Sequence, residues 1–209
     1  LEDAGEAGIA IEYVETNASW HKSSEKTELI LRNLRQRGVD TLLISMDPFH
    51  NEFIPFRQVK DLIRCCHENG IGVFAWKEAF FDELDAMGED APHTLEEWSS
   101  RFGEGNLASL IQRYGLGLKG RALATFRPWL EQMPLERILQ ASAPCKELAG
   151  PYHFHLDLFG NFIPQSCQGL SLSFEDIRQG VTTAAYPVFS RLYEDGIGSL
   201  LSYARAEHG

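Results

Sequence analysis

Segment 41–53, TLLISMDPFHNEF, constrains the fold of this chain more than any other segment. It opens with the apolar run 41–44 and ends in the polar residues Ser45, Asp47 and His50. A short apolar run of this kind predicts a strand buried on both faces, as in the parallel sheets of α/β proteins. Polar groups just after the carboxyl end of such a strand lie where α/β proteins place their chemistry. Because Asp, Pro and Asn are also turn residues, the alternative is a helix cap and turn cluster.

The same layout occurs upstream, where Thr16 and Asn17 follow a strand predicted at 9–15. Capping residues and apolar spacing then predict the following elements: helix 25–37, strand 41–46, helix 55–70, strand 71–76, helices 94–102 and 106–114, and a short strand with a turn at 116–123. Strands that alternate with helices predict parallel strands joined by right-handed crossovers.

The pattern changes after residue 124. Helical sequence leads into HFHLDLFGNFIP, which predicts a β-hairpin with a Gly160–Asn161 turn, and two further helices are predicted at 187–195 and 197–207. We therefore expect an α/β domain at 1–124 and an extension with a Cys/His hairpin at 125–209.

Composition excludes some partners. The net charge is −11 and the pI is about 5.1, which disfavours nucleic acid because phosphate binding needs a basic surface. Four cysteines are too few for a disulfide scaffold in a chain of 209 residues. No apolar run approaches the roughly 18 residues that a membrane helix needs, and no signal-peptide pattern is present. We therefore expect a cytoplasmic protein without a membrane partner.

Four segments together resemble the later two-thirds of a radical S-adenosylmethionine enzyme: VETNASW, LLISMDPFHNEFIP, GRAL and HFHLDLFGNFIPQSC. The resemblance implies a partial (βα) barrel that lacks its first strands, with 1–124 supplying strands three to six. It also implies S-adenosylmethionine and a 4Fe–4S cluster as cofactors. The family's CxxxCxxC loop, which holds that cluster, is absent from this sequence. The chain would then form the far side of the cofactor site and the pocket for an unknown small-molecule or peptide substrate, and would be inactive alone.

The resemblance also implies roles for individual residues. Those that would contact the cofactor are Thr16, Asn17, Ser45 and Arg121, and the candidates for catalysis at the same mouth are Asp47 and His50. Short hydroxyl and amide side chains at strand ends can bond to an amino acid and a ribose, and an Arg can bind a carboxylate with two hydrogen bonds. The alternatives are that Thr16 and Asn17 cap a helix or turn and that Arg121 is a surface residue.

A second candidate site is a metal site formed by Cys145, His153, His155 and Cys167. His153 and His155 are two residues apart, so both project from one face of a strand, and Asp157 continues that face. A set of two Cys and two His suits zinc as well as iron, and two cysteines around this hairpin resemble the start of an extension that binds an auxiliary cluster in some radical enzymes. The alternative is that His and Asp form hydrogen bonds within the hairpin while the cysteines pack among apolar side chains.

The residues are also compatible with two other functions. A metal-dependent hydrolase would use the HxH pair and a metal-activated water. A non-catalytic binding module would keep the fold without the cluster.

Overall fold

The computed structural model describes residues 1–115, 121–150, 152–164, 169–182 and 184–208. The chain is α/β and divides into two compact units, Leu1–Tyr114 and Gly115–Gly209. This division precedes the predicted boundary at residue 124. Each unit is described below by itself.

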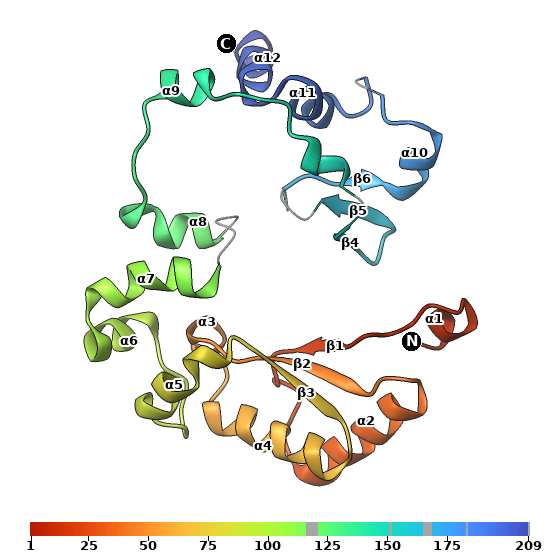
Figure 1. Cartoon of the computed structure of the whole chain (residues 1–209), viewed down its shortest axis with the longest axis vertical. Helices are drawn as coiled ribbons and strands as arrows, with labels where there is room; N and C mark the ends of the chain where they lie inside the picture. Colours follow the sequence, from red (N-terminus) through yellow and green to blue (C-terminus); the bar gives the residue numbers. More distant parts are fainter. Residues whose placement is uncertain (116–120, 151, 165–168, 183, 209) are drawn as a thin grey trace. The chain divides into compact units, whose positions relative to one another are not determined.

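The first unit is built on a parallel sheet in the order β1-β2-β3, formed by β1 (Val14–Thr16), β2 (Thr41–Ser45) and β3 (Gly72–Trp76) (Figure 1). Thr16 pairs with Ile44, and Ser45 pairs with Trp76, so the three strands end at the same edge of the sheet. The prediction that the first two strands are adjacent and parallel is confirmed. The first strand is shorter than predicted, because pairing with β2 begins only at Val14.

Two crossover helices cover one face of this sheet: α2 (Ser24–Gln36) and α4 (Phe56–Glu68) (Figure 1). Successive right-handed crossovers to neighbouring strands place both helices on the same face. Leu42 and Ile44 of β2 are buried, as are Leu31 of α2 and Leu62 of α4. These four side chains belong to the apolar core of the first unit.

The opposite face of the sheet is more exposed. Side chains alternate along a strand, so Leu43, Ser45, Phe74 and Trp76 lie on this face together with Glu15 of β1. Phe74 is 47% exposed and Trp76 is 36% exposed. Their rings contact each other edge to face, with centroids 6.0 Å apart. The sheet therefore has one face covered by helices and one face with aromatic and polar side chains in contact with solvent.

The remaining helices of the first unit are α1 (Glu2–Glu6), α3 (Pro48–Asn51), η1 (Glu78–Phe80), α5 (Phe81–Met87), α6 (Leu95–Phe102) and α7 (Glu104–Tyr114). The predicted helix at 94–102 is confirmed as α6, which begins with a capping box. The Thr94 hydroxyl accepts a hydrogen bond from the backbone N–H of Glu97, and the Glu97 carboxylate accepts one from the backbone N–H of Thr94. This exchange satisfies two N–H groups at the start of α6.

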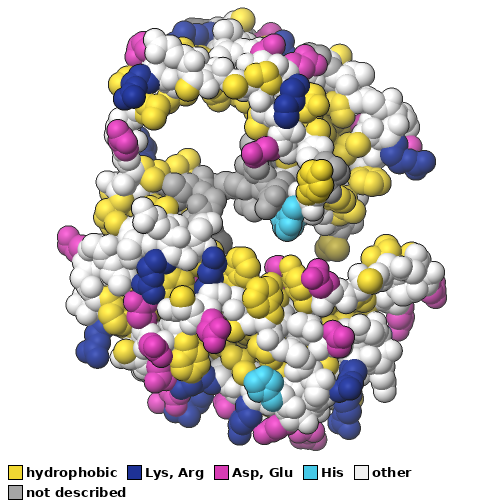
Figure 2. All heavy atoms as spheres, in the orientation of Figure 1, with side chains coloured by type: hydrophobic (Ala, Val, Ile, Leu, Met, Phe, Trp, Pro, Cys, Tyr) yellow, Lys and Arg dark blue, Asp and Glu magenta, His cyan; other side chains and the backbone are white. Residues whose placement is uncertain are grey.

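Charged side chains of both signs lie on the surface. Figure 2 shows acidic and basic side chains interspersed on the visible face of each unit. Lys60 of α4, for example, bonds to Asp85 and Glu89. These pairs link α4 to the last turn of α5 and to the residue Glu89 after it. Ion pairs near the surface contribute little stability.

The second unit contains an antiparallel sheet in the order β4-β5-β6, formed by β4 (Phe154–Leu156), β5 (Asn161–Pro164) and β6 (Leu172–Ser173). Its helices are α8 (Arg121–Phe126), η2 (Arg127–Trp129), α9 (Leu135–Gln140), η3 (Lys146–Ala149), α10 (Phe174–Gln179), α11 (Pro187–Asp195) and α12 (Ile197–His208). The buried core joins Leu148, Phe162, Leu172 and Phe189. The predicted hairpin and the two predicted closing helices are confirmed.

One local prediction is wrong and another is tested only in part. Of the strand and turn predicted at 116–123, residues 116–120 lie outside the described residues, whereas 121–123 begin helix α8. The hairpin turn spans 157–160 instead of Gly160–Asn161. Gly160 has the expected positive φ of 77°, but Asn161 pairs with Ser173 and belongs to β5. The described residues thus contain three parallel strands and no closed barrel.

Within the described residues, none of the helices combines the length and apolar character needed to cross a membrane. The cytoplasmic location stays a prediction.

Replacing Leu62 with Ala should lower the free energy of unfolding of the first unit by about 2–5 kcal/mol. Leu62 is 0% exposed, so the shorter side chain leaves a cavity between α4 and the sheet. Urea unfolding followed by circular dichroism measures the change. Leu29→Ala is the matched control, because Leu29 of α2 is 58% exposed and its loss should cost less than about 0.5 kcal/mol. Equal effects of the two variants would contradict the described core.

Candidate functional site

The predicted site residues of the first unit lie at one edge of its sheet. Thr16 and Asn17 follow β1, whereas Ser45 and Asp47 end and follow β2. Because β1 and β2 run parallel and in register, these ends meet at the carboxyl edge. The structure therefore brings Thr16, Asn17, Ser45 and Asp47 to the same end of the sheet.

Asp47 and His50 form the best-defined pair at this edge. Asp47 is 1% exposed, and its Oδ1 accepts hydrogen bonds from the backbone N–H groups of Phe49 and His50, each at 3.0 Å. Its Oδ2 lies 2.7 Å from His50 Nδ1. The carboxylate therefore caps α3 and also orients the imidazole. The cap that was the alternative interpretation of this cluster is present together with the Asp–His contact.

The contact changes the acid–base behaviour of His50. Its hydrogen bond to Asp47 raises the pKa of His50 above 6.5, while partial burial acts in the opposite direction. Since Nδ1–H donates to the carboxylate, the neutral ring carries its lone pair on Nε2. The His50 side chain is 35% exposed, so a ligand can reach the ring. An imidazole held in this way can accept or donate a proton.

Two further residues of the edge were missed from the sequence. Burial raises the pKa of Tyr114 to about 12, the negative charge of Asp47 adds to this shift, and a hydrogen bond with Trp76 opposes it. Tyr114 therefore lies beside Asp47, although it comes from the end of α7. Lys77 directly follows β3, and its Nζ lies 4.7 Å from the centre of the Trp76 ring. The position of Lys77 after a predicted strand could have indicated it, whereas the contact of Tyr114 with Asp47 is tertiary.

Thr16 and Asn17 use their oxygens within a local turn. Thr16 Oγ1 accepts hydrogen bonds from the backbone N–H of Ala18 at 3.1 Å and from the indole N–H of Trp20 at 2.7 Å. Asn17 Oδ1 accepts one from the backbone N–H of Ser19 at 3.0 Å. Among the described residues, the Thr16 O–H and the Asn17 NH₂ have no acceptor of their own. Both side chains thus retain donors that a ligand could use.

The other two residues predicted to contact the cofactor are Ser45 and Arg121. Ser45 is half-buried, and its hydroxyl makes no hydrogen bond with the described part of the chain. Arg121 begins α8 in the second unit, and its side chain lies outside the description. Ser45 therefore joins Thr16 and Asn17 as a candidate contact, and the role of Arg121 stays a prediction.

The two histidines of the hairpin share a face, as predicted. The ring centroids of His153 and His155 are 5.1 Å apart, and both residues are exposed. Asp157 does not join them. Its carboxylate accepts three hydrogen bonds, from the side-chain amide of Asn161 and from the backbone N–H groups of Asn161 and Phe159, which lower the pKa of Asp157. Asp157 therefore closes the hairpin turn.

The cysteines are placed mostly among apolar side chains. Cys145 is half-buried and packs against the core of the second unit, and Cys167 lies outside the described residues. Cys65 and Cys66 are buried on α4, and burial raises the pKa of the Cys66 thiol to about 12. The described residues contain no group of three or more His, Cys, Asp and Glu side chains that could hold a metal ion. The Cys/His metal site accordingly stays a prediction.

No family model, curated protein or solved structure matches this chain. The function must therefore be argued from the geometry of its residues.

Replacing Asp47 with Asn should lower the pKa of His50, because a neutral amide stabilises the imidazolium less than a carboxylate does. In the unchanged protein, the raised pKa means that protonated His50 stabilises the fold below pH 6.5, and that this contribution disappears as the pH rises through the raised value. The variant should lose this pH dependence. Ring ¹⁵N shifts measured by NMR during a pH titration give the pKa and the tautomer.

The control is Asp40→Asn, which removes an exposed carboxylate just before β2, at the opposite end of the strand. Its His50 should titrate as in the unchanged protein. If Asp47→Asn leaves the pKa of His50 unchanged, the hydrogen bond to Asp47 is not the cause of the raised pKa.

Proposed function

We propose that the first unit is the part of a radical S-adenosylmethionine-type (βα) barrel that binds the far side of the cofactor and the substrate. One observation carries this proposal: three parallel strands have both crossover helices on one face and polar side chains at their common carboxyl edge. Barrel enzymes place their helices outside and their sites at the carboxyl ends of the strands. The open face of the sheet would then correspond to the inner face of such a barrel.

The residues at the edge fit the far side of S-adenosylmethionine. Thr16, Asn17 and Ser45 would offer two hydroxyl donors and one amide donor to the ribose or the amino acid part of the cofactor. The cofactor would supply the reactive chemistry when bound. The chain's own residues would hold it and exclude water from it.

The residues do not fit the 4Fe–4S cluster. Three of the four cysteines are described, and two of these are neighbours buried on α4 while the third packs against the core of the second unit. A cluster needs several thiolates that converge on it. The proposal therefore assigns no cluster and no electron-transfer step to the described residues.

Asp47 and His50 would act on the substrate. The carboxylate bonds to Nδ1 of the imidazole and raises the pKa of His50, so that Nε2 would exchange a proton with a bound group near neutral pH. Tyr114 beside Asp47 would remain protonated and would help to fix the carboxylate. In a non-catalytic binding module, the same pair would bind the ligand through hydrogen bonds alone.

The geometry of the hairpin does not support a metal-dependent hydrolase that uses the HxH pair, His153 and His155. Asp157, the carboxylate that would complete its ligand set, is used in the hairpin turn. The two histidines are left without a third described ligand near them.

The proposal predicts saturable binding of S-adenosylmethionine to the full chain, measured by equilibrium dialysis up to millimolar ligand. Ser45→Ala should weaken this binding about tenfold, because a hydrogen bond to a charged or strongly polar group is lost. Ser100→Ala, at an exposed position on α6, is the matched control and should bind as the unchanged protein does. No saturable binding, or equal affinities for all three proteins, would refute the proposed cofactor site.

A second experiment concerns the cluster. Incubation of the chain with S-adenosylmethionine and dithionite should give no 5′-deoxyadenosine above background, because the described cysteines do not converge. Product in stoichiometric amount, measured by chromatography, would reveal a cluster site that the proposal does not include.

A further inference from the structure

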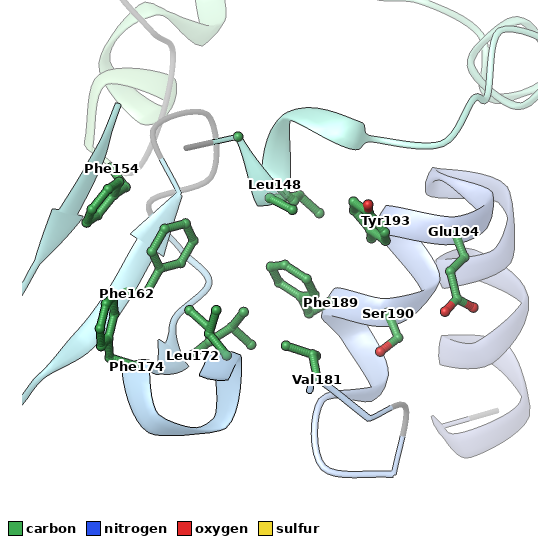
Figure 3. Close-up of a pocket in the computed structure, with 13 residues that line it drawn as sticks. Leu148, Phe154, Phe162, Leu172, Phe174, Val181, Phe189, Ser190, Tyr193 and Glu194 are labelled. Carbon is green, nitrogen blue, oxygen red and sulfur yellow. The ribbon is translucent and has the colours of Figure 1, made fainter. Parts of the chain in front are cut away.

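The second unit contains an apolar cavity of about 480 Å³. It lies between η3, the strands β5 and β6, and the helices α10 and α11. Phe189 projects from α11 into the centre of the group formed by Leu148, Phe162 and Leu172 (Figure 3). A volume of this size is within the usual range for sites that bind small organic molecules.

Part of the apolar lining is in contact with solvent. Phe154, Phe174 and Val181 line the cavity and remain 39%, 42% and 36% exposed, respectively. Large apolar side chains that surround a hollow and face solvent lose contact with water when a ligand covers them. The cavity therefore favours a ligand with an apolar body.

The polar groups of the cavity come from one side of α11. Ser190 and Glu194 are four residues apart on this helix, so they are neighbours on its surface. Ser190 is 5% exposed, and its hydroxyl makes no hydrogen bond within the described part of the chain. Glu194 is exposed at the rim and is the charged side chain among the described residues that line the cavity.

Two cations near α11 contact aromatic rings. The Arg191 guanidinium lies 3.9 Å from the centre of the Tyr203 ring and donates a hydrogen bond to the Pro187 carbonyl. Lys146 Nζ lies 3.9 Å from the centre of the Tyr193 ring. Among the described residues, Glu194 has no ion pair, so its charge is available to a ligand.

We propose that this cavity binds a small amphiphile with an aromatic or aliphatic body and a primary ammonium head. The body would fill the space around Phe189, and the head would lie at the rim, where it pairs with Glu194 and donates to the Ser190 hydroxyl. The Phe189 and Tyr193 rings, which stack with centroids 6.2 Å apart, form the wall beside this head. This site lies in the second unit and is independent of the site proposed for S-adenosylmethionine.

The probes are three compounds that differ only in their head group: 4-phenylbutylamine, 4-phenylbutanol and 4-phenylbutyrate. Isothermal titration calorimetry with the full chain should show the amine binding about fivefold more tightly than the alcohol, the gain expected from one exposed ion pair, and the carboxylate binding most weakly. Chemical shifts of the amides of β5 and α11 should report where the probes bind. If no probe binds, or if the carboxylate equals the amine, the proposal is wrong.

Variants of the chain test the contacts of the ligand's head group and of its apolar body separately. Glu194→Gln should reduce the affinity for the amine to that for the alcohol and leave the alcohol unchanged, whereas Asp195→Asn, one residue beyond, should change neither. Val181→Trp, which adds a larger side chain to the lining of the cavity from an exposed position, should abolish binding of the amine and the alcohol. A Glu194→Gln protein that still prefers the amine, or a Val181→Trp protein that binds both probes normally, would overturn the proposed site.

Discussion

The burial of strand β2 is the constraint on which the first unit depends. Leu42, Leu43 and Ile44 are 1%, 4% and 0% exposed, and both edges of the strand pair in parallel with a neighbour. Burying such side chains contributes roughly 1.5–3 kcal/mol each. Because the side-chain period of a strand is two, a shift of one residue would turn Ile44 out of the core and would move Ser45 as well. The packing of β2 therefore fixes the position of the residues that follow it.

Asp47 links this core to the polar edge. A carboxylate that is removed from water is costly unless donors surround it, and here two backbone N–H groups and His50 Nδ1 supply them. The same bonds start α3 and hold the imidazole. A change at Asp47 therefore acts on the helix, on the pKa of His50 and on the orientation of the ring together. The Tyr114 hydroxyl adds a hydrogen bond to this carboxylate.

The sequence predicts the elements of this chain well where the signals are local. Apolar periodicity and capping residues indicated β2, α2, α4 and α6, and alternation of strand and helix indicated the parallel sheet. Residues 121–123, which were predicted to end a strand and turn, begin α8 instead, because RALATF consists largely of good helix formers. The turn at Asn161 failed because the Asp157 side chain closes the loop earlier. The proximity of Tyr114 to Asp47 depends on tertiary packing, which no local pattern encodes.

Asp47 and Asp157 show why residue type alone does not locate a site. Each Asp accepts hydrogen bonds from two backbone N–H groups that follow it in the chain, as turn and cap residues do. The donors lie two and three residues after Asp47, and two and four residues after Asp157. Asp47 differs because it is buried and has one oxygen left for His50, whereas both oxygens of Asp157 are taken up within its own turn. A charge can change the pKa of a neighbour most strongly where water screens it least. The proposed acid–base role therefore falls on Asp47 and His50 at the edge of the parallel sheet, and not on the hairpin.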